Sequence, residues 1–337
     1  MIFCGSTLLS LMFLIVCNMR FGLRKGKDVA FDRNDGISLK GIAAFFVIAS
    51  HLYVYGGFKS IEEGLIAHLI GTMVTQLGGI GVLIFLFVSG YGIQEGYNTK
   101  KVGKQYLLNR IRKVWMPYLC IKFLFIVIGK IFNVRNIIKA EDWFIFVITF
   151  EYIVYYLVRK VTENKKSIVF GMLVFNAVGS FLCICLCFPA KYFNSMWLFV
   201  VGVVFSCYQK KIVFLLKKNI LFNSFLALIC FLCLGIIFTI FKGQFFCEAC
   251  KPVSGIALVV FLCCILRNIE LKSPVLKWGG KNSLQLYVVH VSLHDFFPHL
   301  NGIFMVIYLI ITVIIVEGIV RITDKLRLGT RKRLENF

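Results

Sequence analysis

Long apolar runs recur from one end of the chain to the other, separated by short polar or basic segments. A run of about 20 apolar residues is the length that an α-helix needs to cross a bilayer. The runs are continuous rather than alternating, so they predict helices and not the strands of a membrane barrel. We therefore predict an all-α, polytopic transmembrane bundle of about eleven spans, at residues 1–19, 37–57, 69–90, 114–132, 143–158, 167–187, 195–208, 220–241, 252–266, 284–299 and 302–320.

Composition supports this fold class. The 337 residues are 59% hydrophobic and 15% aromatic, with a mean hydropathy of +0.84. A soluble domain of this size does not have such values. We divide the chain into an N-terminal helix with a basic loop (1–36), a membrane domain (37–320) and a basic tail (321–337).

The net charge of +22 is informative because of where the charges lie along the chain. Of the 38 Lys and Arg residues, 29 fall in every second loop and in the tail, seven in the other loops, and Lys40 and Lys122 within spans. Short cytoplasmic loops carry such an excess of cations. This predicts a plasma-membrane protein with its N-terminus outside and its C-terminus cytoplasmic, and it makes nucleic acid an unexpected partner.

The 13 cysteines lie mostly within apolar runs, where cysteine acts as a small hydrophobic side chain. Cys247 and Cys250 have CxxC spacing, but a structural zinc site needs four ligands. A loop disulfide is the other reading of this pair, and the sequence leaves its role open. No metal is predicted.

The span 37–57 combines two ionisable groups, Lys40 near its start and His51 well inside. Eleven residues of α-helix return to within about 20° of the starting direction, so both side chains share one face. They lie about 16 Å apart along the axis. Ionisable groups at membrane depth are costly and mark functional sites. This geometry suits a reaction whose two reactants come from opposite sides of the bilayer.

Six segments then occur in an order that resembles acyltransferase family 3, the multi-pass membrane acyltransferases. Lys40 and His51 lie in SLKGIAAFFVIASH, which is similar to the family's basic-residue-x10-His signature, with Lys where Arg is commoner. The others are QLGGIGVLIFLFVSGY (76–91), YLLNRIRKVWMPY (106–118), Trp143-Phe144 with Tyr152, WLFVVG (197–202) and KNSLQLYVVH (281–290). The resemblance covers about 37–320, and residues 1–19 add a helix to the usual ten.

The resemblance implies transfer of an acyl group, usually acetyl from cytoplasmic acetyl-CoA, to a hydroxyl of a cell-surface polysaccharide or a related acceptor. No permanently bound cofactor is implied; acetyl-CoA or another acyl-CoA is the donor substrate, and a glycan or lipid-linked sugar is the acceptor partner. The acceptor's identity, the acyl chain and the oligomeric state stay open.

Coenzyme A carries several phosphate charges, so its site needs clustered cations at the cytoplasmic surface. The candidates are Lys40, Arg110, Arg112 and Lys113, each of which also has a purely topological explanation. His51 is the candidate general base, taking the proton of the acceptor hydroxyl, or the nucleophile that briefly carries the acyl group. Its structural alternative is a buried imidazole bonded to a carbonyl.

The remaining candidates are weaker, and each has a structural alternative. Ser89, before Gly90, either offers donors to a phosphate or thioester or belongs to close helix packing. Glu151 either orients His51 and lines the acceptor path or makes a pair with Lys122 or an interhelical hydrogen bond.

The candidate acceptor contacts are Trp143, Tyr152, His290 and Asp295. Trp143 and Tyr152, with Trp197, suit stacking on sugar rings, and aromatic belts at membrane interfaces also explain them. We expect His290 to line the site or to have a structural role, and Asp295 to contact the acceptor.

Two other functions remain to be weighed. A transporter or a flippase for a lipid-linked sugar also places charge within the membrane, but such proteins have repeat-related halves with matching Gly/Pro breaks. The five prolines show no such pairing. A structural membrane protein would leave the ordered motif set unexplained.

Overall fold

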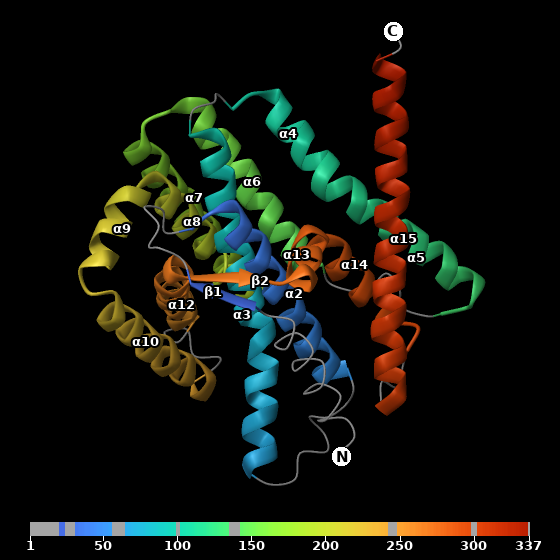
Figure 1. Ribbon diagram of the computed structural model, residues 1–337, viewed down its shortest axis with the longest axis horizontal. Helices are drawn as coiled ribbons and strands as arrows, with labels where there is room; N and C mark the ends of the chain where they lie inside the picture. The colour runs from blue at the N-terminus through green and yellow to red at the C-terminus, as the bar shows by residue number, and fades with distance from the viewer. Residues whose placement is uncertain are drawn as a thin grey trace.

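The computed structural model describes residues 20–23, 31–55, 65–98, 102–134, 142–241, 248–297 and 302–335. The predicted first span and Cys247 lie outside these residues. Helices dominate the described chain (Figure 1). They are α2 (Arg33–Tyr55), α3 (Leu65–Tyr97), α4 (Lys104–Arg110), a π-helical segment (Ile111–Trp115), α5 (Met116–Ile131), α6 (Trp143–Val161), α7 (Lys165–Cys185), α8 (Trp197–Cys207), α9 (Gln209–Lys218), α10 (Ile220–Ile240), α12 (Cys250–Asn268), α13 (Pro274–Lys281), α14 (Ser283–His294) and α15 (Gly302–Glu335).

The all-α polytopic bundle is confirmed. Eight of the described helical stretches are long and apolar enough to cross a membrane, and each corresponds to a predicted span. α6 has 19 residues and carries Glu151 near its middle.

The structure differs from the prediction at 284–299. The chain there forms α14, which has only 12 residues. Such a helix is about 18 Å long, well short of a hydrocarbon core of about 30 Å. α14 by itself is therefore too short to cross the membrane.

A small β-ribbon was not predicted. Residues Arg20–Leu23 (β1) pair antiparallel with Ile269–Lys272 (β2), in a register that places Arg20 opposite Lys272. Strands of four residues are too short to give a periodic hydrophobic signal. The ribbon fixes the segment that leads into α13.

The outer helices expose apolar side chains, as lipid contact requires. Along the whole of α10 only Ala227 is buried, although the helix is the second most apolar of the candidate spans. In water such a helix would lose its hydrophobic stabilisation. In a bilayer the exposed side chains meet lipid.

The centre of the bundle depends on close helix contacts at glycine. α2 packs against α3 and α13, and α3 packs against α8 (Figure 1). A Cβ added at Gly90 of α3 would collide with the carbonyl of Phe199 in α8, and one added at Gly280 of α13 would collide with the carbonyl of Ile37 in α2. Small residues allow this backbone approach in membranes.

The Gly90 contact predicts a matched pair of substitutions. Gly90→Ala should destabilise the protein by about 1–3 kcal/mol, because the new methyl group must push α3 away from α8. Gly92→Ala, one half-turn further, meets no atom within 4 Å and should change stability by less than about 1 kcal/mol, in the stabilising direction. Thermal denaturation in detergent, followed by size-exclusion chromatography, measures both. Equal denaturation temperatures for the two variants would contradict the packing argument.

Candidate active site

A large basic cavity lies between the ends of several helices. We call it the basic cavity; its volume is about 800 Å³. Five cations line it, from four parts of the fold, together with two acids. They are Arg33, Lys40, Arg110, Lys113 and Lys281, with Glu317 and Asp324. The cavity is therefore suited to an anionic ligand.

Lys40 enters this cavity because α13 packs tightly on α2. Gly41 faces the backbone of Leu276, and Gly280 faces that of Ile37. This contact places Lys281, at the end of α13, beside the Lys40 end of α2. Two cations from distant parts of the sequence therefore share one wall.

Two more cations come from the end of α4 and from the π-helical segment that follows it. Arg110, Lys113, Val114 and Pro117 all line the cavity, with spacings of three and four residues that keep them on one helix face. Pro117 has no N–H and its ring crowds the carbonyl four residues earlier, which favours a wider turn just before α5. Arg112 is exposed and does not line the cavity.

Arg110 and Lys40 remain available to a ligand. The Arg110 guanidinium lies over the rings of Tyr106 and Tyr152, 5.4 and 5.3 Å from their centroids. Its Nε is buried without a hydrogen-bond partner. Within the described residues, no carboxylate makes an ion pair with Arg110 or Lys40. Both side chains are half-buried, and a cation withdrawn from water without a counter-ion is costly, which a bound anion would relieve.

The start of α14 adds a further anion-binding feature that the sequence analysis missed. Ser283, Leu284 and Gln285 line the cavity, and the N-cap residue Asn282 makes no side-chain cap hydrogen bond. The first N–H groups of a helix carry partial positive charge and bind anions. The signal in the sequence was the turn-forming stretch Gly279-Gly280 and Asn282-Ser283, which divides α13 from α14.

Ser89 also lines the basic cavity. The adjacent Gly90 is occupied in packing against α8. Gly90 therefore serves close helix packing, and the role of Ser89 as a donor to a phosphate or thioester stays a prediction.

His51 and His290 form the central contact of the site. Nδ1 of His51 lies 2.9 Å from Nε2 of His290, and Nδ1 of His290 lies 2.7 Å from the carbonyl oxygen of Leu286. The rings are stacked, with centroids 5.1 Å apart. Tyr308 donates its hydroxyl hydrogen to the carbonyl oxygen of His290, which holds this turn of α14 in place.

This chain of hydrogen bonds fixes both tautomers. A carbonyl oxygen can only accept, so Nδ1 of His290 carries the hydrogen. In the neutral imidazole the Nε2 of His290 is then an acceptor, and Nδ1 of His51 must donate to it. The Nε2 of His51 is left with its lone pair, as a general base or nucleophile requires.

Two rings separate the basic cavity from this histidine pair. Tyr287 and Phe144 line the cavity, and their centroids are 5.5 Å apart. The Tyr287 ring is also 5.8 Å from that of His290. Neither His51 nor His290 lines the cavity, so these rings form part of the wall between the cavity and the histidine pair.

Glu151 makes its hydrogen bond to Asn176 rather than to His51. It is fully buried, and its Oε2 accepts a hydrogen bond of 3.3 Å from Nδ2 of Asn176 in α7. This is the interhelical hydrogen bond named as its structural alternative. Lys122 instead pairs with Asp142, at 2.9 Å.

The other predicted residues divide between the two sides of the histidine pair. Tyr152 lines the basic cavity and stacks with Arg110. Trp143 does not line it; its ring packs near Phe144 and Tyr192. Asp295 follows α14 at the far end, with its buried Oδ2 unpartnered. Within the described chain no group of three or more His, Cys, Asp or Glu side chains is arranged to hold a metal ion.

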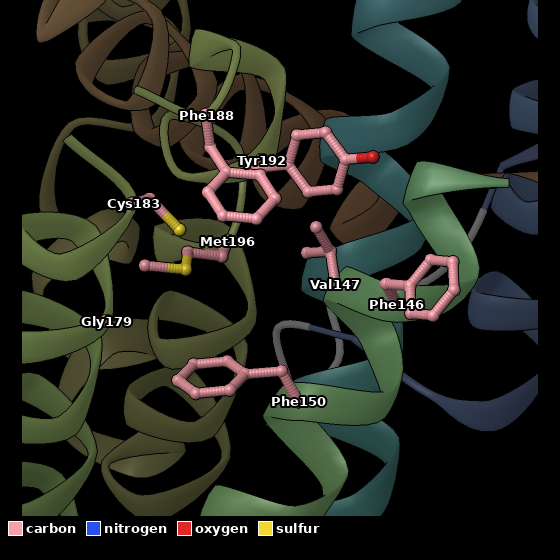
Figure 2. A pocket seen from close by; sticks show the side chains of 8 residues that line it. All are labelled: Phe146, Val147, Phe150, Gly179, Cys183, Phe188, Tyr192 and Met196. Atoms are coloured by element: carbon pink, nitrogen blue, oxygen red, sulfur yellow. The ribbon is translucent and has the colours of Figure 1, made fainter. Parts of the chain in front are cut away.

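A second cavity, of about 420 Å³, lies between α6, α7 and the segment before α8. Figure 2 shows the aromatic rings of Phe150, Phe188 and Tyr192 around it. None of its lining residues carries a charge, so it does not suit an anionic ligand. This cavity is suited to contact with an apolar group and has no charged side chain for catalysis.

The fold and the site define a membrane protein in which a basic cavity lies beside a hydrogen-bonded pair of histidines, with Tyr287 between them. Comparison with known proteins gives the family. Residues 36–320 match acyltransferase family 3, described as an acyltransferase domain, and the chain belongs to this family. It is a membrane acyltransferase. No curated protein and no solved structure matches the chain.

Proposed function

We propose that this protein is an O-acyltransferase that moves an acetyl group from cytoplasmic acetyl-CoA to a hydroxyl of a cell-surface or exopolysaccharide glycan. The observation that carries the proposal is the hydrogen-bond chain from Leu286 through His290 to His51. It leaves the Nε2 of His51 as a base next to a cavity built for anions.

The donor assignment is supported by the charges of the basic cavity. The phosphates of coenzyme A match Lys40, Arg110, Lys113 and the open start of α14. The pantetheine arm then extends past Tyr287 and Phe144, and the thioester reaches His51. The distribution of Lys and Arg supports a cytoplasmic position for this end and a plasma-membrane location.

In the proposed reaction, the proton that His51 takes from the acceptor is returned to the leaving group. The Nε2 of His51 takes the proton of the acceptor hydroxyl while the oxygen attacks the thioester carbonyl. The imidazolium donates through Nδ1 to His290, which stabilises its charge. The carbon–sulfur bond breaks, and His51 returns the proton to the sulfur of coenzyme A. In the alternative order of steps, His51 first attacks the thioester itself and carries the acyl group until the acceptor hydroxyl takes it.

The role proposed for His51 can be tested by substitution. Replacing it with Asn should lower transfer of labelled acetyl from acetyl-CoA to the surface glycan by about 100-fold or more, the range for loss of a general base. Binding of coenzyme A to the purified variant should be unchanged, because the cations that hold the phosphates are intact. Full transfer by His51→Asn would refute the mechanism.

Two arginines that are close in the sequence provide a matched test of the donor site. Arg110→Gln should weaken coenzyme A binding about tenfold or more, since one charge-assisted hydrogen bond contributes about 1.5–3 kcal/mol. Arg112→Gln is the matched control, because Arg112 is exposed and outside the cavity. Isothermal titration of both variants in detergent compares the dissociation constants. Equal affinities would remove Arg110 from the donor site.

A further inference from the structure

A group of polar residues lies on the side of His51 that faces away from the basic cavity. We call it the distal polar cluster: Tyr55, Tyr118, Lys122, Asp142, His294 and Asp295. Tyr55 is the last residue of α2, and His294 is the last residue of α14. Their rings stack with centroids 3.7 Å apart, and the Tyr55 ring is 5.3 Å from that of His51. The cluster therefore borders the reacting histidine.

Asp142 is the central acid of the cluster. Its Oδ2 accepts a hydrogen bond of 2.7 Å from the hydroxyl of Tyr118 and pairs with the Nζ of Lys122 at 2.9 Å. The residue is only 5% exposed, yet its Oδ1 has no hydrogen-bond partner in the described chain.

Asp142 lies at a position where its side chain would ordinarily bond to its own helix. It is the N-cap of α6, where an Asp side chain ordinarily accepts from the first turn and contributes about 1 kcal/mol. Here the side chain makes no cap hydrogen bond. The carboxylate is turned from its own helix toward the cluster, which a purely structural cap does not explain.

Two more atoms of the cluster are buried without partners: Oδ2 of Asp295 and Nδ1 of His294. α14, which ends at His294, packs against α5, which carries Tyr118 and Lys122. The ring of Phe125 in α5 also lies 5.9 Å from that of Phe296, the residue after Asp295, so these parts of the cluster lie on packed segments. Each buried polar atom left unpaired costs about 1–3 kcal/mol. The two carboxylate oxygens among them, Oδ1 of Asp142 and Oδ2 of Asp295, indicate a ligand that supplies hydrogen-bond donors.

The chemistry of these atoms defines the ligand. Carboxylate oxygens only accept, so they bind hydroxyl groups. The two carboxylates outnumber the one lysine, so the cluster repels phosphate and carboxylate groups. Building on the proposed function, we propose that the distal polar cluster binds the acceptor as a neutral sugar, through its hydroxyl groups, and presents one hydroxyl to His51.

The test separates the acceptor step from the donor step in purified, reconstituted protein. Cleavage of labelled acetyl-CoA by water, compared between the natural protein and His51→Asn, reports the donor site and His51. Acetyl transfer to a panel of neutral glycosides, uronic acids and sugar phosphates reports the acceptor site.

The variants are Asp142→Asn and Asp295→Asn, with Glu163→Gln as control. Glu163 is exposed, in the loop at the other end of α6. Each Asn variant should raise the KM for the neutral glycoside about tenfold or more and leave coenzyme A binding and thioester cleavage unchanged. Asp295→Asn breaks no ion pair, so it keeps the test valid where Asp142→Asn fails to fold. The natural protein should prefer neutral over anionic sugars.

The outcomes that overturn the inference are distinct. An unchanged KM in Asp295→Asn, or equal use of neutral and anionic sugars by the natural protein, refutes the cluster as acceptor site while thioester cleavage still depends on His51. Acetyl transfer that is absent with every acceptor in the panel, or independent of His51, refutes the proposed function and this inference with it.

Discussion

The hydrogen bond between His51 and His290 joins helices that are 239 residues apart in the sequence. It determines which nitrogen of His51 carries its hydrogen, because the partner's own Nδ1 is committed to the carbonyl oxygen of Leu286. A lone histidine in an apolar helix would exchange between tautomers. Here the protein selects one of them by geometry, and the lone pair for chemistry is set on Nε2.

The surrounding fold brings the two sides of the reaction to this bond. α2 carries Lys40 in the basic cavity and, eleven residues later, His51. α14 begins in the same cavity and ends beside Tyr55. Because α14 is short, its uncapped start and its two histidines fit within the membrane domain. The glycine contacts of α13 with α2 fix this alignment.

The sequence was sufficient for the features that follow from local periodicity. It predicted the eight spans that the structure describes as membrane-length helices. The shared face of Lys40 and His51 follows from the helical repeat alone. Lys40, Arg110, Lys113, Ser89 and Tyr152, all named from the ordered motifs, line one cavity.

Features that depend on tertiary contact were not predictable. His290 was expected near the site, but its bond to His51 requires two helices to meet at a particular rotation. Glu151 was a candidate to orient His51, and the structure pairs it with Asn176 instead. Asp142 was missed, because an acid before an apolar run looks like an ordinary N-cap. The short length of α14 was also not predicted, because the sequence after Ser283 was interpreted as one longer span.

The most direct measurement is nitrogen-15 NMR of the histidine side chains in lipid nanodiscs, at a pH where the imidazoles are neutral. The chain has five histidines, so single substitutions can assign them. The account predicts that His51 is protonated at Nδ1 and unprotonated at Nε2, with a coupling across the bond to Nε2 of His290, and that His290→Phe abolishes this preference. A hydrogen on Nε2 of His51 in the natural protein would contradict it.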